Sequence, residues 1–237
     1  MNRLIKRQFI VLTAVFVFFL FVSMSNNNVV NYYEPEMVFV EGGAFEMGMA
    51  VMGSNPSIHS KGDNYPVDNV SWEDVQEFIA KLNKLTGKNY RLPTEMEWKY
   101  ASKGGAKSKG YKYSGSNNLH DVAWFEDNSN GSTHPVGSKL PNELGIYDMA
   151  GNVREWTSES VYHNFPTVWD SDPKIVFFRL LLGSGWRNGR CGGYSENLLD
   201  EPDQKADVYG FRLVLSVENN QFVTVFASAN PEGITYL

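Results

Sequence analysis

The sequence predicts an α+β domain in which few helices and scattered short strands are joined by long structured loops. Only residues 72–86 show the apolar spacing of a long helix. Residues from about 104 to 144 are rich in Gly, Asn, Ser and Asp, so regular structure there should be sparse. The chain has 237 residues and 42% hydrophobic content, which is enough for one substantial core.

Residues 1–25 have the pattern of a secretory signal. Three basic residues precede the unbroken apolar run 9–22, and small serines follow it where a cleavage site would lie. The run is shorter than the roughly 20 residues that a helix needs to span a bilayer. We therefore expect a cleaved signal and an exported protein, whether periplasmic, at the cell surface or secreted. The alternative is a signal anchor that keeps the chain in a membrane through residues 9–22.

A polar linker over 26–36 leads to the stretch MVFVEGGAFEMG, which is typical of an opening strand or hairpin. The first helix should begin after Ser71, a good N-cap, and end at Gly87. Its apolar stripe indicates one buried face, formed by Val75, Phe78, Ile79, Leu82 and Leu85.

A second, short helix is predicted after Pro93. Thr94 and Glu97 have the spacing of a capping box, and the helix should carry Trp98 inward. Glu95 and Glu97 are interpreted as carboxylates at a helix N-terminus rather than as an acid–base pair. The apolar runs 175–186 and 209–216 predict two late strands, and alternation at 222–226 predicts a further strand in the tail.

Charge and cysteine content exclude several classes of protein. The formal net charge of −6 is spread without long runs of one sign, so binding to nucleic acid is not expected. Cys191 is the sole cysteine, which rules out an intramolecular disulfide. Beside Arg190, this thiol is either reactive or, as we favour, a structural cysteine. The four histidines show no metal-ligand spacing.

Five blocks of the chain, in order, resemble those of the formylglycine-generating enzyme family, also called sulfatase-modifying factor domains. They are MVFVEGGAFEMG, PVDNVSWEDVQEF, YRLPTEMEWKYAS, HPVGSKLPNELGIYDMAGNVREW, and GSGW leading to YGFRLV. The resemblance covers residues 37–215 and implies an irregular, C-type-lectin-like fold. The N-terminal part looks shortened relative to the family, and residues 216–237 form a C-terminal extension.

The resemblance implies a structural calcium ion at the turn 145–156. Side-chain oxygens would come from Asp148 and Glu155, and backbone carbonyls from Gly151 and Val153. In the alternative reading, Asp148 caps a turn and Glu155 pairs with a nearby base. Trp156 belongs to the core in either case. Arg154 stands where the family usually has an aromatic residue, and we expect its side chain to point to solvent.

Active members of this family are implied to hold copper(I) on a pair of cysteines, and this chain has only Cys191. We therefore expect no copper, no catalytic residues, and a non-catalytic protein that binds an unknown protein or glycan. Membrane contact is expected only through an uncleaved N-terminal segment. The expected binding face is the loop 187–206, with candidate ligand-binding residues Arg187, Asn188, Arg190 and Tyr194.

Three alternatives stay open at this point. The loop 187–206 is equally consistent with an ordinary solvated connection. The chain is alternatively a working oxidase that makes formylglycine from a sulfatase cysteine. It is alternatively a decayed copy without function.

Overall fold

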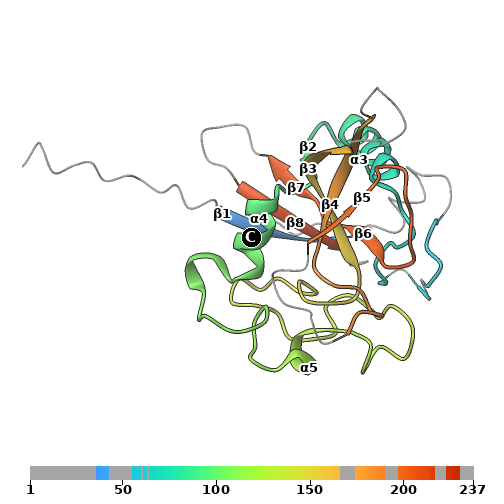
Figure 1. The fold of residues 1–237 in the computed structure, drawn as a ribbon. Coiled ribbons are helices and arrows are strands. Elements are labelled where there is room, and N and C mark those ends of the chain that lie inside the picture. The colour runs from blue at the N-terminus through green and yellow to red at the C-terminus, as the bar shows by residue number, and fades with distance from the viewer. Residues whose placement is uncertain are drawn as a thin grey trace, which may run out of the picture. The chain divides into compact units, whose positions relative to one another are not determined.

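Three small sheets and two main helices form the described part of the computed structural model (Figure 1). The structure describes residues 36–42, 55–59, 61–62, 64–165, 174–189, 197–216 and 223–229, all within the unit Pro35–Leu237. The expected signal or anchor over 1–25 lies outside the described residues. Within them, no helix has the length and apolar character that crossing a membrane requires.

Helix α3 (Trp72–Thr86) confirms the first predicted helix and its caps. The Ser71 hydroxyl accepts the Asp74 N–H, and the Asp74 carboxylate accepts the Ser71 N–H, which makes a capping box. Gly87 ends the helix in the left-handed conformation, at φ 68°. The predicted stripe is buried except for Leu85, which is 67% exposed because the last turn of the helix runs out into solvent beside exposed Lys84.

Helix α4 (Glu95–Ser102) confirms the second predicted helix. Thr94 and Glu97 form its capping box. Arg91 of β2 (Asn89–Arg91) donates two hydrogen bonds of 2.7 Å to the same Glu97 carboxylate. This bidentate ion pair fixes the helix against the preceding strand. Trp98 faces inward and is 1% exposed. Glu97 thus takes part in a helix cap and in an ion pair, which agrees with its interpretation as a structural carboxylate.

A four-stranded sheet runs through the middle of the described part, in the order β5-β4-β3-β6. The long strands β3 (Arg154–Phe165) and β4 (Lys174–Leu182) are antiparallel, and β5 (Leu198–Asp200) pairs with β4. β6 (Tyr209–Phe211) lies parallel to the start of β3. The predicted strand 175–186 corresponds to β4, which ends earlier because Gly183 turns the chain at φ 78°.

The predicted strand 209–216 is two strands in the structure. β6 joins the central sheet, whereas β7 (Val214–Ser216) pairs antiparallel with β2 in a separate sheet. The break lies at Arg212, whose buried side chain bonds to Glu155. The prediction of one continuous strand is therefore wrong. The chain passes from the central sheet to a second sheet at Arg212, whose guanidinium lies inside the protein.

The opening strand and the tail strand pair with each other. β1 (Glu36–Gly42) and β8 (Val223–Ala229) are parallel, with Glu36 opposite Val223 and Gly42 opposite Ala229. Figure 1 shows the blue and the red strand side by side, although about 180 residues separate them in the sequence. The structure thus confirms a strand in each of the two segments.

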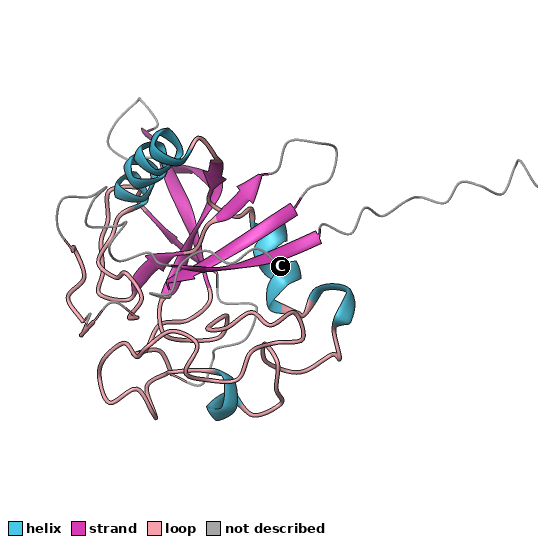
Figure 2. Ribbon diagram, turned by 180° about the vertical axis from the view of Figure 1, so that it is seen from behind, coloured by secondary structure: helices cyan, strands magenta, loops and turns pink. Residues whose placement is uncertain are grey.

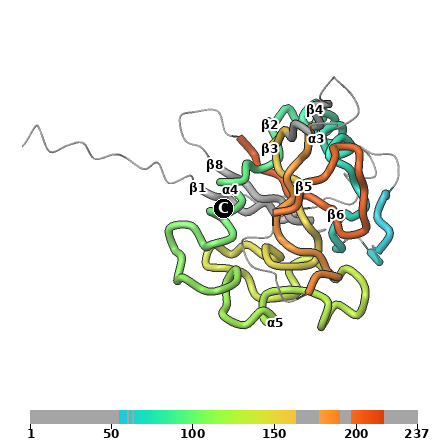
Figure 3. Tube along the Cα trace, viewed as in Figure 1, coloured from blue at the N-terminus to red at the C-terminus, as the bar shows by residue number. Residues whose placement is uncertain are grey.

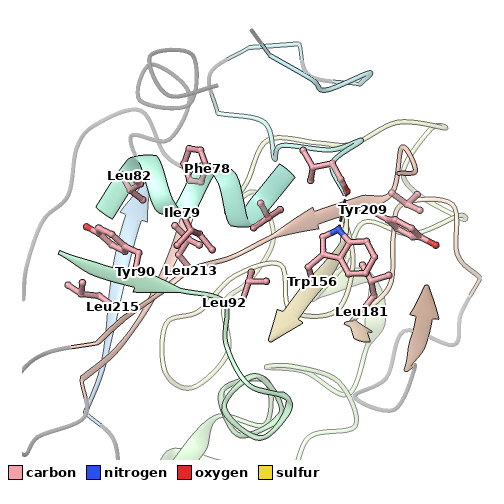
Figure 4. Packing of buried hydrophobic residues seen from close by; sticks show 13 residues of the cluster. Phe78, Ile79, Leu82, Tyr90, Leu92, Trp156, Leu181, Tyr209, Leu213 and Leu215 are labelled. Atoms are coloured by element: carbon pink, nitrogen blue, oxygen red, sulfur yellow. Dashed lines mark hydrogen bonds between the residues drawn. The ribbon is translucent and has the colours of Figure 1, made fainter. Parts of the chain in front are cut away.

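The largest core cluster lies between α3 and the strands (Figure 4). Trp156 at the start of β3 is fully buried there, and its Nε1 donates to the carbonyl of Val70 at 3.0 Å. The indole nitrogen is thereby satisfied away from water. The expectation that Trp156 belongs to the core is confirmed.

Residues 103–153 contain little regular structure, which confirms the prediction for residues from about 104 to 144 and extends it to the start of β3. Their helical segments are η1 (Gly105–Lys107) and α5 (Leu119–Val122), and the rest is turns and loops. Figures 2 and 3 show this stretch as a layer of loops on one side of the strands. It has a small core of its own around Val122 and Phe125. Hydrophobic burial therefore holds even the irregular part in one conformation.

Candidate binding face and buried carboxylate turn

The loop 183–189 (GSGWRNG) leaves β4 in a conformation that depends on glycine. Gly183 has a left-handed φ of 78°, which other residues adopt at a cost. At Gly185, an added Cβ would lie 2.7 Å from the Cβ of Val208. Ser184 Oγ donates to the carbonyl of Ala150 at 2.7 Å. These contacts fix the base of the loop on the core and set the direction of the residues that follow.

Trp186 and Asp207 join this loop to the segment before β6. Trp186 Nε1 donates to the Asp207 carbonyl at 3.0 Å. The Asp207 carboxylate in turn contacts Arg187 Nη1 at 2.8 Å and His59 Nε2 at 3.3 Å. The His59 ring lies edge-on to Trp186, with centroids 4.9 Å apart. Arg187 is therefore held at one nitrogen, while its side chain stays 52% exposed at the surface.

Asn188 has a structural part in the same loop. Its Oδ1 accepts the Gly185 N–H at 2.6 Å, and its own N–H donates to the Gly185 carbonyl. Its carbonyl also accepts the Glu126 N–H at 3.0 Å. The side-chain oxygen is thus engaged inside the loop. Of the four predicted ligand-binding residues, the structure places Arg187 and Asn188 together, whereas Arg190 and Tyr194 lie outside the described residues, as does Cys191.

Segment 197–206 brings further charges to this face. Tyr209 donates its phenol hydrogen to Asp200 Oδ2 at 2.7 Å, and burial together with this hydrogen bond raises the pKa of Tyr209. Lys205 pairs with Asp74 at the start of α3 at 2.6 Å. The face therefore presents both signs of charge on a supported backbone.

His59 is a residue of this face that sequence reasoning missed. Its N–H and that of Ile58 donate to the buried Asp68 carboxylate, at 3.2 and 2.7 Å, which fixes the segment. Burial raises the pKa of Asp68 above its usual range. His59 and Asp207 are 148 positions apart, and no local pattern connects them.

The turn 145–156 positions a buried carboxylate at Asp148. Its φ is 58°, and Oδ2 accepts the Gly137 N–H at 2.7 Å. Oδ1 is buried and receives no hydrogen bond from any described residue. Burial raises the pKa of Asp148 to about 6, although Gly137 and Arg212 act in the opposite direction. This carboxylate has an oxygen available and a charge that burial destabilises.

Glu155 has a different environment at the start of β3. Arg212 donates from Nε to Oε2 at 2.5 Å and from Nη2 to Oε1 at 2.6 Å. Trp98 Nε1 also donates to Oε2 at 2.6 Å. Glu155 therefore pairs with a nearby base, as the alternative reading of this turn has it, and the buried, bidentate arginine neutralises its charge.

Several oxygen atoms of the turn are candidates to bind calcium. Asp148 Oδ1 has no hydrogen-bond donor among the described residues, and Glu155 Oε1 accepts one hydrogen bond and so keeps a free lone pair. The Gly151 carbonyl accepts the Val153 N–H, two residues further on, at 3.1 Å. These donors fit a hard cation that prefers oxygen, with Asp148 as the residue that would gain most. Calcium binding at Asp148, Gly151, Val153 and Glu155 stays a prediction.

The expectation that the Arg154 side chain points to solvent is wrong. The residue is buried, and Nη1 donates to the Gly183 carbonyl at 2.9 Å. The guanidinium thus supports the base of the loop after β4. Buried arginine is stable there because it finds a backbone acceptor.

His134 has a structural role in the loop layer. It stacks on Trp124 at 3.8 Å, and its backbone groups bond to Asn152 in both directions. Among the described residues, no three His, Cys, Asp or Glu side chains gather in a metal-binding arrangement.

Comparison with known proteins gives consistent relatives. Residues 51–217 match the sulfatase-modifying factor enzyme 1-like domain. The chain is 32% identical over 240 residues to chaperone protein LppX of Paenibacillus barcinonensis, covering 69% of this chain and 82% of that protein. It is 31% identical to formylglycine-generating enzyme of Streptomyces coelicolor, over 63% of this chain and 52% of the relative.

Two further matches extend this range. Inactive C-alpha-formylglycine-generating enzyme 2 of Bos taurus is 32% identical, over 62% of this chain and 49% of that protein. The chain thus spans about half the length of these two enzyme-named relatives. Among solved structures, Treponema denticola variable protein 1 matches with a TM-score of 0.59 and 28% identity, over 76% of this chain and 82% of that one.

The fold and the matched blocks agree with these comparisons. The family model covers more than half of the chain, and the solved relative has the same fold over three quarters of it. The chain belongs to the sulfatase-modifying factor enzyme 1-like domain family.

Proposed function

We propose that this protein is an exported, non-catalytic binding protein that takes a polypeptide ligand on the face around residues 187–207. The cysteine count carries the proposal. The chain contains one cysteine, Cys191, whereas the chemistry that the family resemblance implies needs two thiolates on one copper(I) ion. A single thiolate leaves that soft ion without its second ligand.

The names of two relatives support this direction. One relative is named an inactive formylglycine-generating enzyme, so this family includes a protein whose name describes it as inactive. Another is called a chaperone protein, which favours a polypeptide over a glycan as the ligand of this chain. The experiment therefore includes glycans, so that a glycan ligand can be distinguished from a polypeptide.

The geometry of the face supports binding by a prepared surface. Arg187 is exposed but anchored to Asp207, and the turn under it is closed by Asn188. A side chain that is already oriented loses less conformational entropy on binding than a free one. Arginine and tryptophan are enriched among the residues that contribute most binding energy to protein interfaces, and Trp186 precedes Arg187 in the sequence.

The test uses Arg187→Ala combined with Tyr194→Ala, and leaves Asn188 intact because it closes the turn. The probe is reduced, carboxymethylated lactalbumin, an extended polypeptide, with a glycan array in parallel. We expect the wild type to bind the polypeptide and the variant to bind about tenfold more weakly, which is the usual effect of losing one or two central contacts. The matched control, Lys81→Ala with Tyr162→Ala, removes an exposed cation and ring elsewhere.

Three results would contradict the proposal. Equal binding by the wild type and the double variant places the site elsewhere. Binding to glycans alone makes the ligand class wrong. Conversion of a sulfatase peptide cysteine to an aldehyde by the Cys191→Ser variant, with copper and oxygen present, shows that catalysis survives without the thiol.

A further inference from the structure

Arg179 of β4 packs on the first residue of α3, Trp72. Its guanidinium carbon lies 3.6 Å from the centroid of the indole ring. The indole is held in turn, because Trp72 Nε1 donates to the Thr157 carbonyl at 2.9 Å. A cation over the face of a tryptophan is attracted by the ring, and a side chain so oriented loses little conformational freedom when it binds a ligand. The Arg179 guanidinium is therefore presented in a defined orientation.

Arg179 has no counter-charge within the described part of the chain. The residue is half-buried, and no described Asp or Glu forms an ion pair with it. Asp200 lies opposite Arg179 in the register of β4 and β5. Its carboxylate is engaged elsewhere, by the Tyr209 hydroxyl and the Glu201 N–H. Burial lowers the pKa of Arg179, which is the effect of lost hydration on a cation.

One edge of this guanidinium has hydrogens left to donate. Nη1 donates to the Ser158 carbonyl at the long distance of 3.4 Å. Nε is buried and finds no acceptor among the described residues. A guanidinium binds a carboxylate through Nε and Nη2 together, as Arg212 binds Glu155 in this chain. Because a buried donor without an acceptor is costly, an anion at this edge would be bound favourably.

The Arg179 side chain borders the face proposed for polypeptide binding. β5, which belongs to the segment 197–206, lies beside β4 and pairs with it at Arg179 and Asp200 (Figure 1). The first turn of α3 touches the same segment, because the Glu73 N–H donates to the Pro202 carbonyl at 3.2 Å. A polypeptide on that face can therefore reach the guanidinium.

The charges of this region decide which kind of anion fits. Lys205 is paired with Asp74 at 2.6 Å, whereas Glu73 and Glu201 are exposed carboxylates. The whole chain has a net charge of −6. A polyanion is therefore repelled, while a single carboxylate meets a single cation. The planar fork of an arginine matches the two oxygens of a carboxylate.

We propose that Arg179 and Trp72 form a subsite for one acidic side chain of the polypeptide ligand. The indole supports the guanidinium, whose Nε and Nη2 donate to the ligand carboxylate. This inference rests on the proposed function and adds the chemistry of the ligand: an extended segment with an aspartate or glutamate that is separated from other acidic residues.

The experiment uses overlapping peptides of the lactalbumin sequence, with each cysteine replaced by serine. Every peptide that binds is made again with its Asp and Glu changed, one at a time, to Asn and Gln. The protein forms are the wild type, Arg179→Gln, and the control Lys84→Gln. The control also removes one positive charge, from an exposed residue at the other end of α3.

We expect the loss of one particular carboxylate to weaken wild-type binding about tenfold, because a charge-assisted pair is lost. The same change should have no effect with Arg179→Gln, while Lys84→Gln responds as the wild type does. If Arg179→Gln lowers the thermal midpoint, Arg179→Lys replaces it. That variant keeps the charge without the fork, and should distinguish carboxylate from amide less well than the wild type.

Peptides that bind the wild type equally well with and without their carboxylates overturn the subsite, but leave the proposed binding function in place. The same holds if Arg179→Gln distinguishes carboxylate from amide as the wild type does. Stronger binding of polyglutamate than of any singly acidic peptide also overturns it.

A second measurement needs no polypeptide. The ¹⁵N resonance of Arg179 Nε, identified by its loss in Arg179→Lys, should shift on titration with N-acetylglutamate methylamide at constant ionic strength. The neutral glutamine analogue should leave it in place. Equal responses to the two compounds, or none, overturn the subsite. A shift specific to the carboxylate in a protein that binds no polypeptide supports the anion site and contradicts the proposed function.

Discussion

Two buried carboxylates in one turn have opposite electrostatic situations. Glu155 is neutralised by Arg212 and accepts a further hydrogen bond from Trp98, so its charge is compensated inside the protein. Asp148 accepts one backbone hydrogen bond, and burial raises its pKa to about 6. Of the two carboxylates, Asp148 is therefore the one whose charge a bound cation or a proton would neutralise.

Asp148→Asn should stabilise the metal-free protein above pH 7. The folded-state pKa of Asp148 lies above the ordinary aspartate value of 3.8, so the folded state holds this proton more tightly than the unfolded chain does. Stability contributed by the group is then present at low pH and lost as pH rises from about 4 to about 6. Asparagine keeps an oxygen for Gly137 and has no charge to lose, and we expect a gain of about 2 kcal/mol at pH 7.5. Urea unfolding in chelator at pH 4 and 7.5 measures it.

The same pair of proteins tests the calcium prediction. If calcium binds at this turn, excess calcium raises the thermal midpoint of the wild type relative to chelator, because a ligand of the native state stabilises it. Asp148→Asn should remove most of that shift. A wild-type midpoint that is the same in chelator and in calcium contradicts the site.

Glu155→Gln should destabilise the fold by about 3 kcal/mol in chelator. The substitution leaves the Arg212 guanidinium buried without its counter-charge, and breaking one side of a buried pair is costly. The double variant Glu155→Gln with Arg212→Met removes both charges and should cost less than the sum of the two single variants. A double-mutant cycle by urea unfolding gives the coupling, and additive costs would show that the pair is not coupled.

The helices depend on residues close together in the sequence, whereas the strand boundaries depend on partners far along the chain. Both helices were predictable because capping boxes such as Ser71–Asp74 lie within one turn of the chain. The break of the last core strand at Arg212 was not, because it depends on a partner 57 positions away. For the same reason Arg154 was expected in solvent: its acceptor, the Gly183 carbonyl, comes from another strand end.

Glycines in this fold serve two physical purposes that one substitution distinguishes. At Gly151 an added Cβ would lie 2.4 Å from the Trp124 carbonyl, so Gly151→Ala forces backbone apart and should cost at least about 3 kcal/mol. At Gly87 nothing lies within 4 Å, and Gly87→Ala should cost only about 1 kcal/mol for its left-handed φ of 68°. Urea unfolding measures both, and equal costs would contradict the packing argument.

The first residues of the chain predict where the protein resides. We expect the mature exported protein to begin near Asn26, because basic residues and a short apolar run precede small residues there. Cell fractionation followed by N-terminal sequencing measures this. Recovery of an intact Met1 in the membrane fraction favours the anchor instead, and recovery in the cytoplasm contradicts both readings.

The pairing of β1 with β8 has a consequence for the order of folding. Residues 36–42 find their partner only after residues 223–229 have been made, so the domain cannot complete its structure from its first half. A ribosome adding about 5–20 residues per second needs roughly 10 to 40 s to separate the two events. During that interval residues 36–42 lack their partner strand, so the native domain closes late. If the chain is exported, as we propose, this late closure keeps it extended while it passes through a translocation channel.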